Sequence, residues 1–348
     1  MKTGKWLLSA VLCFGVLAAA CSGNDAAGED DIENAPGMSE ESDGTPEAAA
    51  NQDSEYAYRM PLTGIGSDQE VTRTAFGVMM ENSVSARPQT GLYQADLVYE
   101  VLSEGNITRF LTFYHSNEPE EIGPVRSARD YYVHLNNGYN AIYVSAGGSS
   151  DGLALAESPD VPYISGLVYD GRYFSRSAER SAPHNMYTSY EDLVTVSEQL
   201  GHDLFDGPPE LPFSGELSAG KPAVSFEINY GSTANNVAYK YDAALGGYQR
   251  FNGGVAIIDH RDGTPVAPAS VFAVEMEHRV IDELGRRDID ISSGGDAYLF
   301  REGTVEAVEW KNVDGAILPF KDGEPVGFSP GQTWINVMPD LDRLTIYD

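Results

Sequence analysis

The chain has 348 residues, a formal net charge of −31 and two cysteines, Cys13 and Cys21. A surface this acidic repels nucleic acid and anionic lipid, which argues against either as a general partner. Because no cysteine follows Cys21, the rest of the chain holds no thiol for a disulfide, a zinc site or a nucleophile. The length suffices for one large or two ordinary domains.

Residues 1–20 have the pattern of a lipoprotein signal peptide. Lys2 and Lys5 precede an apolar run over residues 6–20, and small residues lead into Cys21. The run is shorter than the ~20 apolar residues of a membrane span. We therefore expect a lipid on Cys21, which would hold the protein at the extracytoplasmic face of a bacterial cytoplasmic membrane. An ordinary cleaved signal with an incidental cysteine is the alternative.

An acidic segment follows the cysteine over residues 21–58. It contains eleven acidic residues between positions 22 and 58, no lysine or arginine, and few large apolar side chains. Such a composition cannot bury enough surface to offset the entropy lost on ordering. We expect a disordered tether here, with the folded part starting near residue 59.

Strands and helices alternate in the next 150 residues. Apolar and β-branched runs predict strands, while helical spacing and end signals predict helices. A capping box at Ser189 and Asp192 starts the last helix, and Gly201 ends it. The predicted strands are 75–80, 96–102, 109–114 and 141–145, and the predicted helices are 126–135, 151–157 and 190–200. This alternation indicates an α/β layer structure.

Proline, glycine and serine concentrate over residues 206–222, and β patterns dominate beyond them. Phe272, Val274 and Met276 alternate with smaller or polar residues, as in a half-buried strand. The fold class expected is α/β (α+β), with a layered mixed-sheet N-terminal domain over 59–210 and a smaller β-rich domain over 222–345. Trp310 and Trp334 fall in β segments, where they either pack in the core or stack on sugar rings.

The densest polar motif is Gly-Pro-Val-Arg-Ser-Ala-Arg-Asp at residues 123–130. A helix that begins here would place Arg126 and Arg129 on one face, near free backbone amides. Two guanidinium groups and a helix N-terminus suit an anion. Alternatively, Arg129 and Asp130 pair with neighbours such as Glu100 or Glu104 and lock the sheet.

Further charged residues fall within or beside the predicted central strands. Charges at such positions are rarely buried unless they are paired, so they indicate either a polar cleft or a buried ion-pair network. These candidates are Arg87, Asp96, Glu100, Glu104 and Arg109. The Gly-Gly-Ser-Ser run at 147–150 follows a strand and is either a plain turn or an anion-binding loop.

His184 and Asn185 follow a proline in a predicted loop, where a histidine can act as acid, base or ligand donor or be purely structural. The other histidines have no metal-ligand spacing. We therefore expect neither a metal site nor a cofactor.

Taken together, these motifs resemble the YerB-like lipoproteins, a family of two-domain envelope proteins of unassigned function. The resemblance covers about residues 61–340. It rests on Cys21, on the motifs at 87–96, 104–110, 123–130 and 183–185, and on the runs at 295–297 and 330–334. It implies an N-terminal α/β domain followed by a smaller β-rich domain, and it brings no catalytic residues.

A shorter pattern, with Asp96, Arg126, Arg129 and Asp130, is similar to the LytR–CpsA–Psr phosphotransferases, although the arginine spacing differs. Two functions stay open. The first is a non-enzymatic module that binds an anionic cell-wall component or an envelope protein. The second is a hydrolase or phosphotransferase acting on cell-wall glycan or its lipid-linked precursors, with these four residues at its centre.

Overall fold

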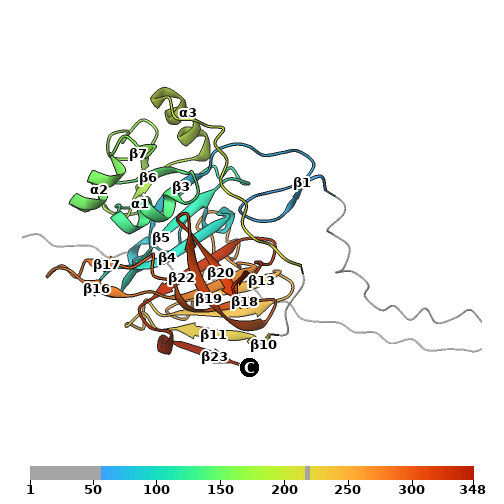
Figure 1. Cartoon of the computed structure of the whole chain (residues 1–348). Coiled ribbons are helices and arrows are strands. Elements are labelled where there is room, and N and C mark those ends of the chain that lie inside the picture. Colours follow the sequence, from blue (N-terminus) through green and yellow to red (C-terminus); the bar gives the residue numbers. More distant parts are fainter. Residues whose placement is uncertain (1–55, 216–219) are drawn as a thin grey trace, which may run out of the picture. The chain divides into compact units, whose positions relative to one another are not determined.

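The computed structural model describes residues 56–215 and 220–348 (Figure 1). The predicted signal peptide, Cys21 and the predicted tether up to residue 55 lie outside this range. In the part of the chain that the structure describes, no helix is long and apolar enough to cross a membrane.

A twelve-stranded mixed sheet forms the centre of the described residues and runs through both halves of the chain. Eleven of its strands lie side by side in the order β21 (Glu324–Pro325), β20 (Ala316–Lys321), β19 (Thr304–Val313), β18 (Gly295–Arg301), β15 (Ser270–Glu275), β22 (Thr333–Met338), β4 (Leu97–Glu104), β5 (Ile107–Tyr114), β3 (Phe76–Glu81), β6 (Ile142–Ser145) and β7 (Tyr163–Ser165). The twelfth strand, β10 (Lys221–Pro222), pairs with β19 beside this order. The junction between the halves is the parallel pair of β22 and β4.

The remaining strands form one five-stranded antiparallel sheet and three small ribbons. The five-stranded sheet has the order β14 (Val255–Ala256), β13 (Gly247–Asn252), β12 (Val237–Asp242), β11 (Ser225–Ile228) and β23 (Leu344–Tyr347). The ribbons are β1 (Tyr58–Arg59) with β2 (Gly66–Ser67), β8 (Ser175–Arg176) with β9 (Met186–Tyr187), and β16 (His278–Val280) with β17 (Arg287–Ile289). The helices are α1 (Asp130–Asn137), α2 (Ser150–Ala156) and α3 (Tyr190–Leu200).

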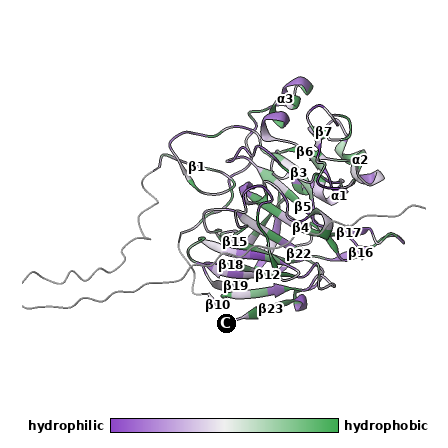
Figure 2. Cartoon of the chain, turned by 180° about the vertical axis from the view of Figure 1, so that it is seen from behind, coloured by the Kyte–Doolittle hydropathy of each residue, from purple (hydrophilic) through white to green (hydrophobic). Residues whose placement is uncertain are grey.

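Both faces of the central sheet are covered, so strands β3, β4 and β5 are buried at nearly every position. Side chains alternate between faces along a strand. One face, with Val78 and Val98, packs in a core shared with α3 and the five-stranded sheet. The other face, with Met79 and Tyr99, packs against α1. Hydrophobic residues accordingly concentrate in the central strands (Figure 2).

The structure confirms the predicted fold class, with mixed layers first and a β-rich region after them. The strands predicted at 75–80, 96–102, 109–114 and 141–145 are β3, β4, β5 and β6 within three residues at each end. Ser189 caps α3 by accepting a hydrogen bond from the amide of Asp192, and Gly201 ends the helix with φ +72°. Trp310 and Trp334 are both fully buried, which favours packing in the core over stacking on sugar rings.

The predicted boundary near residues 206–222 lies between α3 and β10, although the central sheet continues on both sides of it. The described residues all belong to one compact unit. The division into domains 59–210 and 222–345 stays a prediction about folding units.

Candidate functional site

Five charged side chains from separate segments of the chain gather at the carboxyl end of β3, and we call them the arginine cluster. They are Glu81, Glu104, Arg109, Arg126 and Arg129. Glu81 and Arg109 are register partners on β3 and β5. Arg126 pairs with Glu81, while Glu104 pairs with both Arg129 and Arg109, the latter at 2.8 Å. The sequence motifs around these residues therefore meet in space.

The prediction of a helix from Arg126 is wrong, because α1 begins only at Asp130. The segment before it is extended: the Arg126 amide donates to Met79 O (2.8 Å) and the Ala128 amide to Gly147 O (2.8 Å). Strand-like partners on both sides hold this backbone out of the helix. Arg126 and Arg129 thus reach the cluster from an extended run and from the N-cap of α1, not from one helix face.

The glycine-rich loop at 147–150 lies beside this motif. The Ser149 amide donates to Ala128 O (3.2 Å), and the Ser127 hydroxyl donates to Ala146 O (3.2 Å). The loop follows β6, which is parallel to β3, so both strands end at this edge. Ligands of α/β sheets bind beyond the carboxyl ends of parallel strands, and this edge has that position.

His184 extends the cluster, whereas Asn185 does not. The Nδ1 atom of His184 lies 3.6 Å from Glu81 Oε2 and 3.3 Å from the Ser83 hydroxyl. Asn185 points into the small β8–β9 ribbon, where its Oδ1 accepts from Arg176 (3.0 Å). Asp130 starts α1, where a carboxylate is favoured by the helix dipole.

The cluster holds three arginines against two glutamates and is open to solvent at its edge. The side chains of Arg126 and His184 are each 22% exposed and that of Glu104 is 27% exposed. Arg109 and Arg129 are nearly buried, and their Nε atoms have no hydrogen-bond partner among the described residues. The surplus of one positive charge at an edge open to solvent favours an oxyanion there.

Asp96 lies at the far end of the sheet from the arginine cluster. It is the residue before β4, and Glu104 ends that strand, so the two are about 25 Å apart at ~3.3 Å per residue. The buried Asp96 carboxylate accepts hydrogen bonds from the amides of His115 (2.6 Å) and Ser116 (2.8 Å). Burial raises the pKa of Asp96 to about 6, although these hydrogen bonds oppose the rise. Asp96 therefore does not form one site with Arg126 and Arg129.

Glu100 lies at a third location, the buried junction between the two halves of the chain. Its carboxylate forms an ion pair with Arg250 of β13 (2.8 Å), and both side chains are fully buried. It also accepts from Trp334 (3.2 Å) and Asn336 (2.9 Å) on β22. Burial is the largest single influence and would lower the pKa of Arg250, but the charge and hydrogen-bond interactions with Glu100 and Tyr239 together outweigh it and raise the pKa. Of the two alternatives that the sequence left open, a polar cleft and a buried ion-pair network, Glu100 therefore fits the second. Its partner Arg250 lies 150 residues away in the sequence.

Arg87 ties the loop after β3 to the second half of the chain. Its guanidinium donates to Asn82 O (2.6 Å) and to Ala234 O (2.6 Å). Burial and the nearby Arg250 charge lower the pKa of Arg87 to about 10. Its hydrogen bonds to backbone oxygens indicate a structural role.

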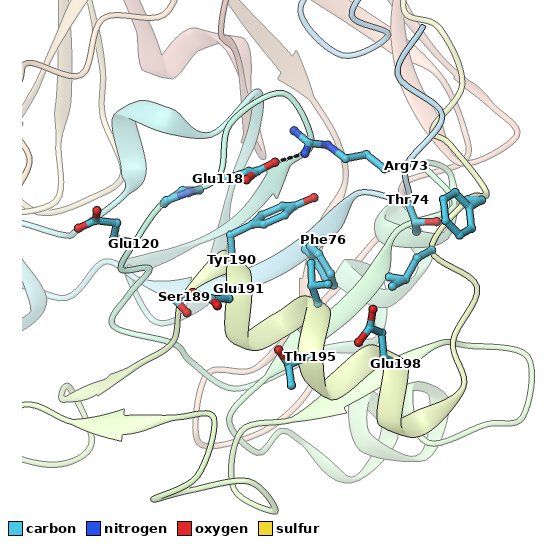
Figure 3. A pocket seen from close by; sticks show the side chains of 14 residues that line it. Arg73, Thr74, Phe76, Glu118, Glu120, Ser189, Tyr190, Glu191, Thr195 and Glu198 are labelled. Atoms are coloured by element: carbon cyan, nitrogen blue, oxygen red, sulfur yellow. Dashed lines mark hydrogen bonds and ion pairs between the residues drawn. The ribbon is translucent and has the colours of Figure 1, made fainter. Parts of the chain in front are cut away.

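A pocket of about 760 Å³ lies at the other end of β3, beside α3 (Figure 3). None of the candidates predicted from the sequence is among the described residues that line it. Its residues come from four separate segments and share no motif, so no local signal in the sequence could have revealed it.

Comparison with known proteins places this arrangement in a family. Residues 62–203 match the N-terminal domain, and residues 226–335 the C-terminal domain, of "Protein of unknown function (DUF3048)". The chain belongs to the DUF3048 family. It is 44% identical over 294 residues to "Putative lipoprotein YerB" of Bacillus subtilis (strain 168), which covers 83% of this chain and 88% of that protein.

A crystal structure of the YerB protein from Bacillus subtilis has the same fold, with a TM-score of 0.79 and 42% identity over 84% of this chain and all of that one. The resemblance to YerB-like lipoproteins is thus confirmed. In this DUF3048 protein, residues 56–215 and 220–348 contain no group of three or more His, Cys, Asp or Glu side chains placed to hold a metal ion.

Proposed function

We propose that this DUF3048 protein is a lipid-anchored protein of the extracytoplasmic face that binds an anionic cell-wall component at the arginine cluster. The observation that carries the proposal is the meeting of three arginines, His184 and the glycine-rich loop at the carboxyl ends of β3 and β6. The name of the Bacillus subtilis relative supports the lipid anchor.

The chemistry of the cluster favours phosphate or carboxylate groups. Arginine offers a flat fork of donors that matches the geometry of both anions. The first-turn amides of α1, which have no acceptor within the helix, lie beside Arg129. Glu81 and Glu104 orient the guanidinium groups, and an anion at the exposed edge would neutralise the surplus positive charge. Within a chain of net charge −31, this local excess of cations is unusual.

The anchor is tested by Cys21→Ala. Because the acylated thiol would be the only covalent link to the membrane, the variant should lose all labelling by a fatty-acid analogue and leave the membrane fraction or keep its signal peptide. Labelling of the intact cells, followed by fractionation, measures both. A variant that is still labelled would rule out lipidation at Cys21.

The site is tested by Arg126→Ala. Arg126 is partly exposed, and its buried partner Glu81 keeps the Ser83 amide and His184 as neighbours, so the loss of Arg126 should lower the free energy of unfolding by less than ~2 kcal/mol. Affinity for a synthetic poly(glycerol phosphate), measured by calorimetry, should fall at least about tenfold, since a charge-assisted contact contributes that much or more. Arg279→Ala, at an exposed pair on β16, is the matched control and should bind as wild type.

Arg129→Ala should be more damaging to the fold than Arg126→Ala, because Arg129 is nearly buried and shares Glu104 with Arg109. Thermal melts with and without the polymer separate the two roles. Equal destabilisation by both substitutions, with no effect of the polymer on the wild-type melt, would leave the cluster as a purely structural network.

A further inference from the structure

The pocket in Figure 3 is enclosed by four segments: the run 73–76 leading into β3, residues 118–120 after β5, helix α3, and residues 204–205 beyond that helix. It is separated from the arginine cluster by the length of β3, about 17 Å for six residues. The two places share no residue.

The inner wall of the pocket is aromatic. The rings of Phe76 and Tyr190 meet edge to face with centroids 5.3 Å apart. The Arg73 guanidinium lies 5.2 Å from the centre of the Tyr190 ring and pairs with Glu118. Phe205, which also lines the pocket, is 79% exposed. A large aromatic side chain left in water beside a pocket is a ready contact for an apolar group.

The rim of the pocket is acidic. Glu118, Glu120, Glu191 and Glu198 line it and are exposed, and Arg73 is the cation among the lining residues. Three negative charges are therefore left over around an aromatic wall. Figure 3 shows Glu191 and Glu198 on α3, with Glu118 and Glu120 across the pocket from the helix.

We propose that this pocket docks a basic segment of a partner protein, with an apolar side chain against Phe76, Tyr190 and Phe205 and lysine or arginine side chains at the acidic rim. Charge complementarity selects this occupant. The segment of this chain before residue 59 carries eleven acids between positions 22 and 58 and would be repelled. An anionic wall polymer would be repelled for the same reason.

The size of the pocket fits a short peptide anchor. About 760 Å³ falls in the range of ligand pockets, roughly 300–1,000 Å³, and holds a few side chains but not a folded domain. Recognition would thus depend on one apolar residue for insertion and on its basic neighbours for attraction. Increasing salt should weaken it, because the rim charges are exposed.

The experiment uses the full chain in neutral detergent and the synthetic peptide amide Lys-Lys-Trp-Lys-Lys, with binding measured by calorimetry. Saturable binding is expected, and the charge-reversed peptide Glu-Glu-Trp-Glu-Glu should not bind. Glu191→Gln with Glu198→Gln should weaken the affinity about tenfold, the effect of two exposed charge contacts. Phe205→Ser should weaken it while leaving the dependence on salt unchanged.

A matched control carries Glu227→Gln and Glu309→Gln, two exposed acids on β11 and β19 that do not line the pocket. It should bind the peptide as wild type does. Equal weakening in the control would show attraction by the acidic surface as a whole and would overturn the proposal. So would the absence of saturable binding to a wild-type protein whose thermal melt shows it to be folded. Neither result bears on the arginine cluster, which is tested with an anionic polymer.

Discussion

Replacing Arg250 by methionine should lower the free energy of unfolding by about 3–5 kcal/mol, because it strands the buried carboxylate of Glu100 without its cation. Arg250 also lies 4.6 Å from the ring centre of Trp334 and 5.3 Å from that of Phe110, and these contacts would be lost too. Chemical denaturation of the full chain, followed by intrinsic fluorescence, measures the change.

Two further variants test whether the stranded charge of Glu100 causes the destabilisation in Arg250→Met. Arg279→Met removes the exposed pair with Asp288 and should cost no more than about 1 kcal/mol. Adding Glu100→Gln to Arg250→Met removes the stranded charge and keeps an acceptor for Trp334 and Asn336, so part of the stability should return. A double variant no more stable than the single one would contradict an electrostatic origin.

The Glu100–Arg250 pair illustrates what the sequence could not predict. Local signals predict β4 as a strand and a β-rich region that contains β13. Which strands become neighbours depends on packing between segments hundreds of residues apart, here on the parallel pairing of β22 with β4. The acid on β4 was therefore recognisable as a residue needing a partner, but its partner on β13 was not.

The region around residue 126 was mispredicted for a related reason. The motif at 123–130 has charged residues at helical spacing, and its last residue does begin α1. Its first part is extended only because Met79 and Gly147 supply backbone acceptors, which no local pattern reveals. Even so, two arginines of the motif, Arg126 and Arg129, lie in one cluster with Glu104; whether that cluster is a binding site stays a prediction. The pocket beside α3 had no such motif, and its aromatic and acidic residues look ordinary in sequence.

His115 provides the second large expected effect, a loss of stability in acid. Its side chain is fully buried, and both ring nitrogens lack a hydrogen-bond partner among the described residues. Burial, together with the nearby Arg73 charge, lowers the pKa of His115 from 6.5 to about 4. Between these pH values the unfolded chain binds more protons than the folded protein. The free energy of unfolding therefore falls as the pH falls from 6.5 to 4, by about 3 kcal/mol from this residue.

Substituting leucine for His115 should remove that contribution. We expect the difference in unfolding free energy between pH 6.5 and pH 4, measured by denaturation at each pH, to be about 3 kcal/mol smaller in His115→Leu than in wild type. His278, whose pKa burial also lowers to about 4, acts in the same direction in both proteins and cancels from the comparison. An unchanged pH dependence in His115→Leu would mean that this ring does not resist protonation in the folded state.

Asp96, which accepts hydrogen bonds from the amides of His115 and Ser116, offers a control of opposite sign. Because burial raises its pKa from 3.8 to about 6, the folded protein binds more protons than the unfolded chain between these values. Asp96 thus adds stability as the pH falls, and it partly offsets His115. Asp96→Asn should therefore make the loss of stability in acid steeper than in wild type, whereas His115→Leu makes it shallower. A general weakening of the loop would instead shift the pH dependence of stability in the same direction in both variants. That outcome would contradict the assignment of opposite effects to Asp96 and His115.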